Sequence, residues 1–264
     1  MESKHTLALE FNEATKSSEV DYKKKLPLYD VNIKRYEIKA LEKLRIDSED
    51  SNSTSPLNML QNRKSFSTIM PQAIVSKKDL LTLLKYSYGL KKSEDGRFKG
   101  TVPSAGGRYS SYIYLFVFNV EGMEPGIYYW EPINYELHKV YVGNYRQEFV
   151  DMIYKMNQID GMKCSFATII TANIPQTCSK YGDRGYRYLC MDAGHISQNM
   201  YLVSGELNLG IRAIGGFYDN EVLKTLNLEK NENAALLVHM FGREYESIER
   251  QLGVNSEFYF IERG

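Results

Sequence analysis

The sequence predicts an α+β fold, with a mostly antiparallel sheet, one long central helix and further helices around it. Short runs rich in β-branched and aromatic residues, separated by Gly, Pro and Asn, are typical of antiparallel strands. Patterns of helical period alternate with these runs, and the longest extends from Arg184 towards Gly210. The chain has 264 residues, of which 43% are hydrophobic and 25% charged, so it can bury a sizeable core. These observations together favour an α+β domain.

The first 55 residues are expected to form a polar extension, and residues 56–264 to form the main domain. The extension contains the triplet Lys23-Lys24-Lys25, which we interpret as a solvated surface rather than an anion site. A Ser/Asn run at residues 48–55 has the composition of a linker. The main domain is therefore expected to begin after this run.

A helix is the first element expected in the main domain. Ser76 and Asp79 have the spacing of a capping box, the leucines within residues 80–84 form an apolar face, and Gly89 provides a stop. Residues 91–111 contain several Gly and a Pro, which predicts a long irregular loop. Loops of this length in compact domains are often functional.

The segments after this loop predict a sheet with helices inserted between its strands. We expect three strands, a helix, a buried strand and a polar loop, in that order, at residues 112–120, 126–130, 135–142, 145–156, 166–172 and 173–183.

The longest helical pattern begins at Arg184. Apolar residues recur in steps of four and three, which places one apolar stripe along the helix, at positions 189, 193, 196, 200, 203 and 207. The helix is expected to end at Gly210, and a short strand at residues 211–214 then stops at Gly215-Gly216. Asp219 can cap a further helix to Leu226, and residues 234–241 predict the last strand.

Charge and hydropathy exclude several classes of function. Lys and Arg number 33, as do Asp and Glu, so the net charge is +0 and no bulk field recruits nucleic acid. The longest apolar stretches, such as residues 113–120, are far shorter than the roughly 20 residues of a membrane-spanning helix. The N-terminus has no signal-peptide pattern. We therefore expect a cytoplasmic protein with neither nucleic acid nor membrane among its partners.

The cysteines and histidines give no sign of a metal site. Cys164, Cys178 and Cys190 form no Cys-x-x-Cys pair, so we expect reduced thiols in or near the core and no bound metal. His195 lies near the apolar stripe of the long helix and is expected to be a hydrogen-bonded core histidine.

Three local patterns could carry chemistry, although the common nucleotide-binding and hydrolase motifs are missing. The cluster Arg63-Lys64-Ser65 with Ser67 offers donors that suit a phosphate, or it forms a solvated basic turn. Lys180 and Tyr181 offer a base and a hydroxyl at one point, or they are surface residues. Glycine pairs could allow a flat ligand to approach the backbone or could serve turns, at Gly106, Gly107, Gly215 and Gly216.

Read in order, these segments resemble the SagB-type azoline dehydrogenases, which are nitroreductase-like flavoproteins. The resemblance spans most of the chain, and the Lys-Tyr-Gly-x-Arg stretch is what narrows it to azoline dehydrogenases. It rests mainly on the segments Arg63-Lys64-Ser65-Phe66-Ser67, Pro103-Ser104-Ala105-Gly106-Gly107, Pro125-Gly126-Ile127-Tyr128, Lys180-Tyr181-Gly182-Asp183-Arg184 and Gly215-Gly216-Phe217.

The resemblance implies a nitroreductase-like fold and one FMN per subunit, held between the two chains of a homodimer. It assigns the phosphate to Arg63, Lys64, Ser65 and Ser67, with Arg243 as a late arginine that completes the site. It places four residues along the edge of the isoalloxazine ring that the partner subunit binds: Pro103, Ser104, Ala105 and Gly107. The backbone N–H groups of Gly215 and Gly216 are assigned to the region of flavin N5.

Two positions depart from the family pattern. Position 67 is Ser where the phosphate motif usually ends in a basic residue, so Lys64 is expected to carry more of the charge. Gly107 replaces an Asn that is common in ordinary nitroreductases, which removes a side-chain contact to the ring.

The implied activity is an FMN-dependent dehydrogenation of peptide thiazoline or oxazoline rings to thiazole or oxazole, in the biosynthesis of a ribosomally made modified peptide. Lys180 would take the Cα proton, and Tyr181 would orient the reacting groups or relay the proton. The implied partners are an azoline-containing peptide and a cyclodehydratase complex. Two alternatives remain open: an NAD(P)H-dependent nitroreductase or flavin reductase, and a non-catalytic flavin-binding subunit of a peptide-cyclising complex.

Overall fold

The computed structural model describes residues 6–16, 56–94 and 96–244. The lysine triplet at residues 23–25 and the Ser/Asn run at 48–55 lie outside these ranges. Within the described part of the predicted extension, one helix, α1, covers Thr6–Thr15.

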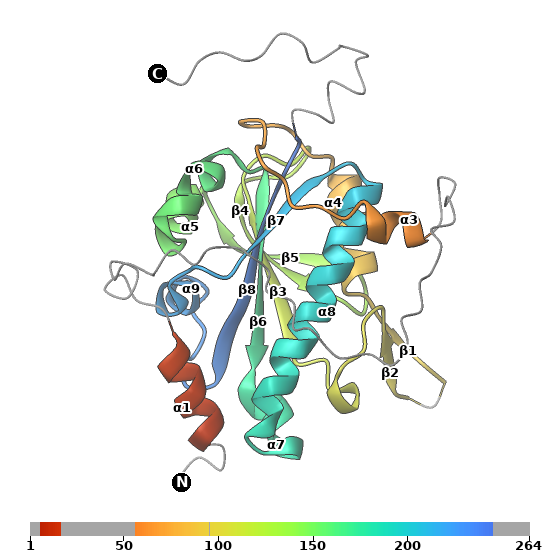
Figure 1. Ribbon diagram of the computed structural model, residues 1–264, viewed down its shortest axis with the longest axis vertical. Helices are drawn as coiled ribbons and strands as arrows, with labels where there is room; N and C mark the ends of the chain where they lie inside the picture. The colour runs from red at the N-terminus through yellow and green to blue at the C-terminus, as the bar shows by residue number, and fades with distance from the viewer. Residues whose placement is uncertain (1–5, 17–55, 95, 245–264) are drawn as a thin grey trace, which may run out of the picture.

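An antiparallel sheet forms the centre of the molecule (Figure 1), as the sequence predicts. Its strand order is β5-β4-β3-β6-β8-β7, and every neighbouring pair is antiparallel. The strands are β3 (Ser111–Val117), β4 (Gly126–Glu131), β5 (Glu136–Val142), β6 (Phe166–Asn173), β7 (Gly210–Ile214) and β8 (Asn233–Gly242).

Helices cover both faces of this sheet. In Figure 1 the long helix α8 and α4 lie on one side of the sheet, and α5, α6 and α9 lie on the other. The helices of the main domain are α3 (Pro56–Gln61), α4 (Lys77–Ser87), α5 (Arg146–Met152), α6 (Lys155–Lys163), α7 (Ile174–Tyr181), α8 (Arg184–Glu206) and α9 (Asp219–Thr225).

The alternation of side chains along β3 separates two hydrophobic cores. Ile113 and Leu115 pack in the core that contains the apolar residues of α4 and α8. Phe116 points to the opposite face and packs in the core that contains Phe149 of α5 and Val222 of α9. This arrangement follows from the two-residue period of a strand that is buried on both faces.

The apolar stripe predicts the buried face of α8 correctly. Leu189, Ala193, Ile196 and Met200 are all buried. The helix ends at Glu206, four residues before the predicted end at Gly210, and the turn that follows leads directly into β7. The Ser76 cap of α4 is also confirmed, because its hydroxyl accepts a hydrogen bond from the backbone N–H of Asp79 at 3.0 Å.

The prediction of a polar loop at residues 173–183 is wrong, because α7 occupies most of it. The side chain of Asn173 accepts a hydrogen bond from the backbone N–H of Gln176 at 3.0 Å, and Pro175 stands in the first turn. Asn at the N-cap with Pro just inside the helix is a recognised start signal. The polar composition of the segment concealed this signal.

Three other boundary predictions need correction. The expected loop at residues 91–111 contains the hairpin strands β1 (Leu90–Lys92) and β2 (Phe98–Gly100) and a 3-10 turn, Ala105–Gly107. The expected helix at 145–156 is two helices, since Ile153 between α5 and α6 is extended. At α9 the N-cap is Tyr218, and Asp219 lies in the first turn instead.

Two expectations about single residues are also wrong. His195 is exposed on α8, whereas His239 on β8 has no exposed surface. Cys164 and Cys178 are buried as expected, whereas Cys190 is exposed.

Candidate functional site

The segment of residues 63–67 runs beside the edge strand β7. The backbone N–H of Phe66 donates to the carbonyl of Ile211 at 2.9 Å, and the Phe66 side chain is buried. Arg63, Lys64, Ser65 and Ser67 on either side of it are all exposed. Burial of one residue thus fixes the segment and leaves its basic and hydroxyl side chains on the surface.

Arg212 on β7 holds this segment from the strand side. Its guanidinium donates to the carbonyls of Phe66, at 2.6 and 3.2 Å, and of Ser67, at 3.1 Å. The Nη1 atom of this guanidinium also forms an ion pair with the Asp160 carboxylate at 2.6 Å. The backbone of the segment is therefore cross-linked to the sheet by a bidentate arginine.

The cationic side chains predicted to bind phosphate differ in the ion pairs and hydrogen bonds that they already form. Lys64 forms an ion pair with Glu244 at 2.6 Å. Arg243 pairs with Asp79 at 2.8 Å and donates to two carbonyls after the end of α8, at 3.0 and 3.1 Å. Arg63 makes no hydrogen bond through its guanidinium to any residue the structure describes, and it lies over the ring of Tyr201, 5.2 Å from its centroid.

The glycine pair at the end of β7 forms an open shelf. Gly215 is exposed, and a Cβ built on it would meet nothing within 4 Å. Gly216 is closely covered by the ring of Tyr154, whose backbone N–H donates to the Gly216 carbonyl at 3.0 Å. One glycine therefore allows close approach of a flat molecule, and the other allows Tyr154 to pack under the shelf.

A buried carboxylate on α8 anchors the loop at residues 103–107. The Ser104 hydroxyl donates to Asp192 at 2.6 Å and accepts from the backbone N–H of Tyr109 at 2.9 Å. The N–H of Ala105 also points to Asp192, at 3.4 Å. Asp192 is 7% exposed, and this burial raises the pKa of its carboxyl above its usual range.

Lys180 and Tyr181 lie in the last turn of α7 and face this same loop. A Cβ added to Gly106 would stand 2.7 Å from the Lys180 Nζ and would collide with the Tyr181 hydroxyl. The Lys180 amine lies 5.2 Å from the centroid of the Tyr181 ring, and that ring packs edge-on against Tyr188 at 5.0 Å. Lys180 is exposed, so its amine is accessible to a substrate.

The structure thus forms two groups from the predicted site residues. The segment 63–67 and the glycine shelf share β7, and the loop 103–107 shares a contact surface with Lys180 and Tyr181. The sequence reading missed Asp192 and Tyr201, because both lie within α8, where only the apolar stripe gave a signal.

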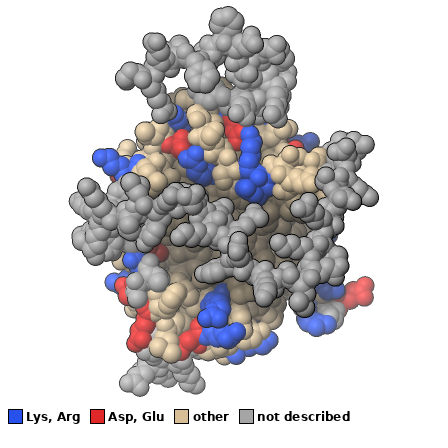
Figure 2. Space-filling model, in the orientation of Figure 1, with Lys and Arg blue, Asp and Glu red and all other residues tan. Residues whose placement is uncertain are grey.

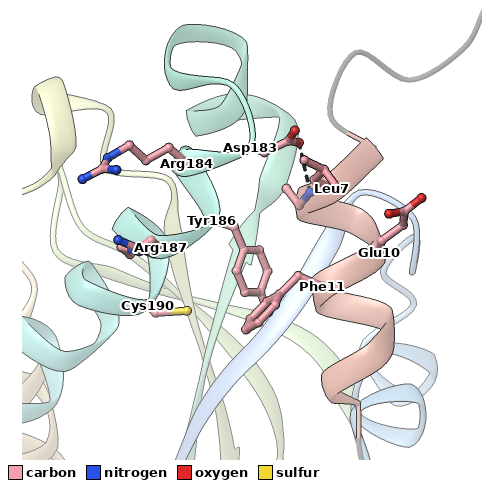
Figure 3. Close-up of a pocket in the computed structure, with 9 residues that line it drawn as sticks. Leu7, Glu10, Phe11, Asp183, Arg184, Tyr186, Arg187 and Cys190 are labelled. Atoms are coloured by element: carbon pink, nitrogen blue, oxygen red, sulfur yellow. Dashed lines mark hydrogen bonds between the residues drawn. The ribbon is translucent and has the colours of Figure 1, made fainter.

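A groove of about 770 Å³ opens between α1 and the start of α8 (Figure 3). Asp183 accepts a hydrogen bond from the backbone N–H of Ala8 at 2.9 Å, drawn dashed in Figure 3. Phe11 and Tyr186 meet edge to face within the groove, with ring centroids 5.5 Å apart. Asp183 and Arg184 in its wall follow α7 directly, so the groove begins close in sequence to Lys180 and Tyr181.

Charges of both signs are spread over the face of the molecule in Figure 2, with Lys and Arg in separate groups. Among the described residues, no three His, Cys, Asp or Glu side chains gather as they would around a metal ion. None of the described helices is both long and apolar enough to span a bilayer.

The strand order, the long helix across one face and the edge strand that ends in two glycines define an α+β domain of the nitroreductase-like fold. Residues 60–243 match the Nitroreductase family, and the chain belongs to that family of oxidoreductases. Proteins of this family generally bind flavin, and a structure with the same fold contains FMN.

Three comparisons describe its relatives. MJ1384 of Methanocaldococcus jannaschii, described as a nitroreductase, is 34% identical over 64% of this chain and 81% of its own. The microcin B17-processing protein McbC of Escherichia coli is 29% identical over 56% of each chain. A chain of the E. coli microcin synthetase McbBCD complex with truncated pro-MccB17 has a TM-score of 0.63, with 24% identity over 88% of this chain and 85% of its own. This last similarity shows the fold.

Proposed function

We propose that the protein is an FMN-dependent dehydrogenase that oxidises thiazoline or oxazoline rings of a peptide to thiazole or oxazole. The observation that carries the proposal is the contact of Lys180 and Tyr181 with Gly106, in the loop expected to line the flavin ring. An amine at a flavin edge could accept the proton that a ring dehydrogenation releases, and a phenol beside it could orient the amine. The 29% identity with McbC, a microcin B17-processing protein, supports the same class of substrate.

The chemistry of the donor groups fits FMN. The guanidinium of Arg63, which has no hydrogen-bond partner among the described residues, and the hydroxyls of Ser65 and Ser67 would hold the phosphate. The exposed Gly215, which has no atom within 4 Å of an added Cβ, would lie against the flat ring. Lys64 and Arg243 would contribute less, because each is already paired with a carboxylate. A bound flavin would supply the hydride acceptor for the oxidation.

Oxidation of an azoline to an azole removes a proton and a hydride from adjacent ring carbons. The Cα proton is the more acidic of the two, because it lies next to a carbonyl, and Lys180 would accept it at Nζ. A bound peptide would cover this exposed amine and exclude water from it. The Tyr181 hydroxyl, which also faces Gly106, would orient the amine or the ring.

The variant Lys180→Ala tests this proposal. We expect it to retain FMN and to lose about 10²–10⁴-fold in the rate of azole formation, the usual contribution of a positioned base. The yellow flavin absorbance measures cofactor content, and mass spectrometry measures the loss of two hydrogens from an azoline peptide. Lys224→Ala, at an exposed lysine on α9, is the matched control and should behave as wild type. Undiminished azole formation by Lys180→Ala would refute the role of Lys180.

A nitroreductase or flavin reductase that uses NAD(P)H is the second candidate, favoured by the 34% identity with MJ1384. Such an enzyme needs no Lys-Tyr pair at the ring. Rapid bleaching of the flavin by NAD(P)H, with no oxidation of an azoline peptide, would select it.

We further propose that the protein works as a homodimer, together with a cyclodehydratase complex that makes the azoline. The similarity to a chain of the McbBCD complex supports such an assembly. A double variant of Lys180 and Tyr181 that left the activity of the whole complex unchanged would instead assign this chain a non-catalytic role.

A further inference from the structure

Tyr201 connects the 63–67 segment to strand β7 through its hydroxyl. The backbone N–H of Ala213 donates to this hydroxyl at 2.9 Å, and the Ser65 hydroxyl lies 2.8 Å from it. The guanidinium of Arg63 covers the ring of the same tyrosine at 5.2 Å. A single side chain of α8 therefore contacts two of the residues that would meet a phosphate.

The hydrogens of this arrangement can be counted. Ala213 supplies its own proton, so Tyr201 and Ser65 have two hydroxyl hydrogens between them, and one of these forms their mutual bond. No other hydrogen-bond partner of either hydroxyl lies in the described part of the chain. One O–H therefore remains to donate outwards, whichever residue carries it. This O–H lies beside the guanidinium of Arg63, which forms no hydrogen bond with any of the described residues.

We infer that Tyr201 is a positioning residue for the phosphate of the flavin cofactor, an inference that rests on the proposed function. Its hydroxyl fixes the Ser65 side chain, and its ring fixes the Arg63 guanidinium by a cation–π contact. The Arg63 side chain is long, the Ser65 hydroxyl rotates freely, and both lie on an exposed segment. Without Tyr201, each group must be ordered when the phosphate binds. Tyr201 therefore pre-orders the phosphate end of the site and leaves the ring end unaffected.

The test compares two ligands that differ only in the phosphate. Apo protein is titrated with FMN and with riboflavin, and the fluorescence of the flavin reports binding. We expect Tyr201→Phe to raise the Kd for FMN about three- to tenfold, the effect of one neutral hydrogen bond. Tyr201→Leu, which also removes the aromatic ring, should raise it further. Neither variant should change the Kd for riboflavin.

A matched control is Tyr114→Phe, which removes a phenol from the opposite face of the sheet and should leave both affinities unchanged. The fluorescence of Trp130, which is buried, reports whether each variant is folded. An unchanged Kd for FMN in both Tyr201 variants would overturn the inference, as would an equal loss of affinity for FMN and riboflavin. Wild-type protein that binds neither ligand would refute the proposed function itself, and the inference with it.

Discussion

At the scale of single residues, His239 shows how a buried titratable group affects stability. Its ring nitrogens lie 2.8 Å from the Ser197 hydroxyl and 3.4 Å from that of Thr168. The side chain has no exposed surface, and this burial lowers the pKa of His239 from 6.5 to about 3. The imidazole is therefore neutral in the folded protein at any moderately acidic pH.

This burial predicts a loss of stability in acid. Between pH 6.5 and 3 the unfolded chain binds a proton at this histidine that the folded chain does not, so the free energy of unfolding falls as the pH falls. The contribution of His239 to the slope approaches about 1.4 kcal/mol per pH unit. Urea unfolding between pH 4.5 and 7 measures this slope. His239→Asn, which cannot titrate, should make the slope shallower, and a slope equal to that of wild type would contradict the assignment.

His195, unlike His239, is exposed. The sequence could not separate these two histidines. The stripe of α8 runs close to His195, yet the 100° step per residue turns it to solvent beside the exposed Met191. His239 lies in a strand buried on both faces, where alternation carries no information.

At the scale of elements, α7 and the 103–107 loop form one unit through Gly106, and Gly122 in the turn between β3 and β4 offers a matched control. Both glycines have positive φ, 59° and 65°, so an added side chain strains the backbone at either position. They differ in their surroundings. A Cβ on Gly106 would meet Lys180 and Tyr181, whereas a Cβ on Gly122 would meet nothing within 4 Å.

This pair separates backbone strain from displacement of the proposed catalytic residues. Gly106→Ala and Gly122→Ala should each lower the free energy of unfolding by about 1–2 kcal/mol, the cost of a left-handed residue. Only Gly106→Ala should also reduce azole formation, because its methyl group displaces the ends of Lys180 and Tyr181. Urea denaturation and an azoline oxidation assay on both variants measure the two effects. Equal activity in the two variants would show that this contact does not matter for the reaction.

Elements with strong periodicity were predictable from the sequence, and those marked only by a cap were not. The eleven residues of α4 and the stripe of α8 follow directly from repeated leucines and from steps of four and three. The eight-residue α7 depends on Asn173 and Pro175 in a polar segment, which suggests a loop by composition. The helix expected at 145–156 covers α5 but only the first two residues of α6, because the extended Ile153 separates the two helices.

At the scale of the whole molecule, the sequence identified the segments of the candidate site, and the fold determines which of them meet. Ser104 and Asp192 are 88 residues apart in sequence, and Ser65 and Tyr201 are 136 apart. No local pattern predicts such contacts, because they depend on how α8 lies across the sheet. Both residues that the sequence reading missed are on this helix for that reason.

The two groups of site residues meet α8 at different places. One group contacts it at Asp192 and the other at Tyr201. Nine residues of an α-helix correspond to about two and a half turns, so these contacts are about 13 Å apart along the axis and on opposite sides of the helix. The resemblance places the loop 103–107 against the flavin of the partner subunit, and Lys180 contacts this loop at Gly106. We therefore propose that one flavin takes its phosphate site from one chain and its Lys180 from the partner chain.

Mixing two inactive variants tests that proposal. Arg63→Glu places a negative charge at the phosphate site, and Lys180→Ala removes the base, so each homodimer should be nearly inactive. If the two groups act across the subunit boundary, a mixed dimer has one site with both defects and one intact site. Equal mixing gives half mixed dimers, so about a quarter of the wild-type activity should return. If each site used one chain only, every site in the mixture would carry a defect, and an assay of azoline oxidation after co-expression would find no recovery.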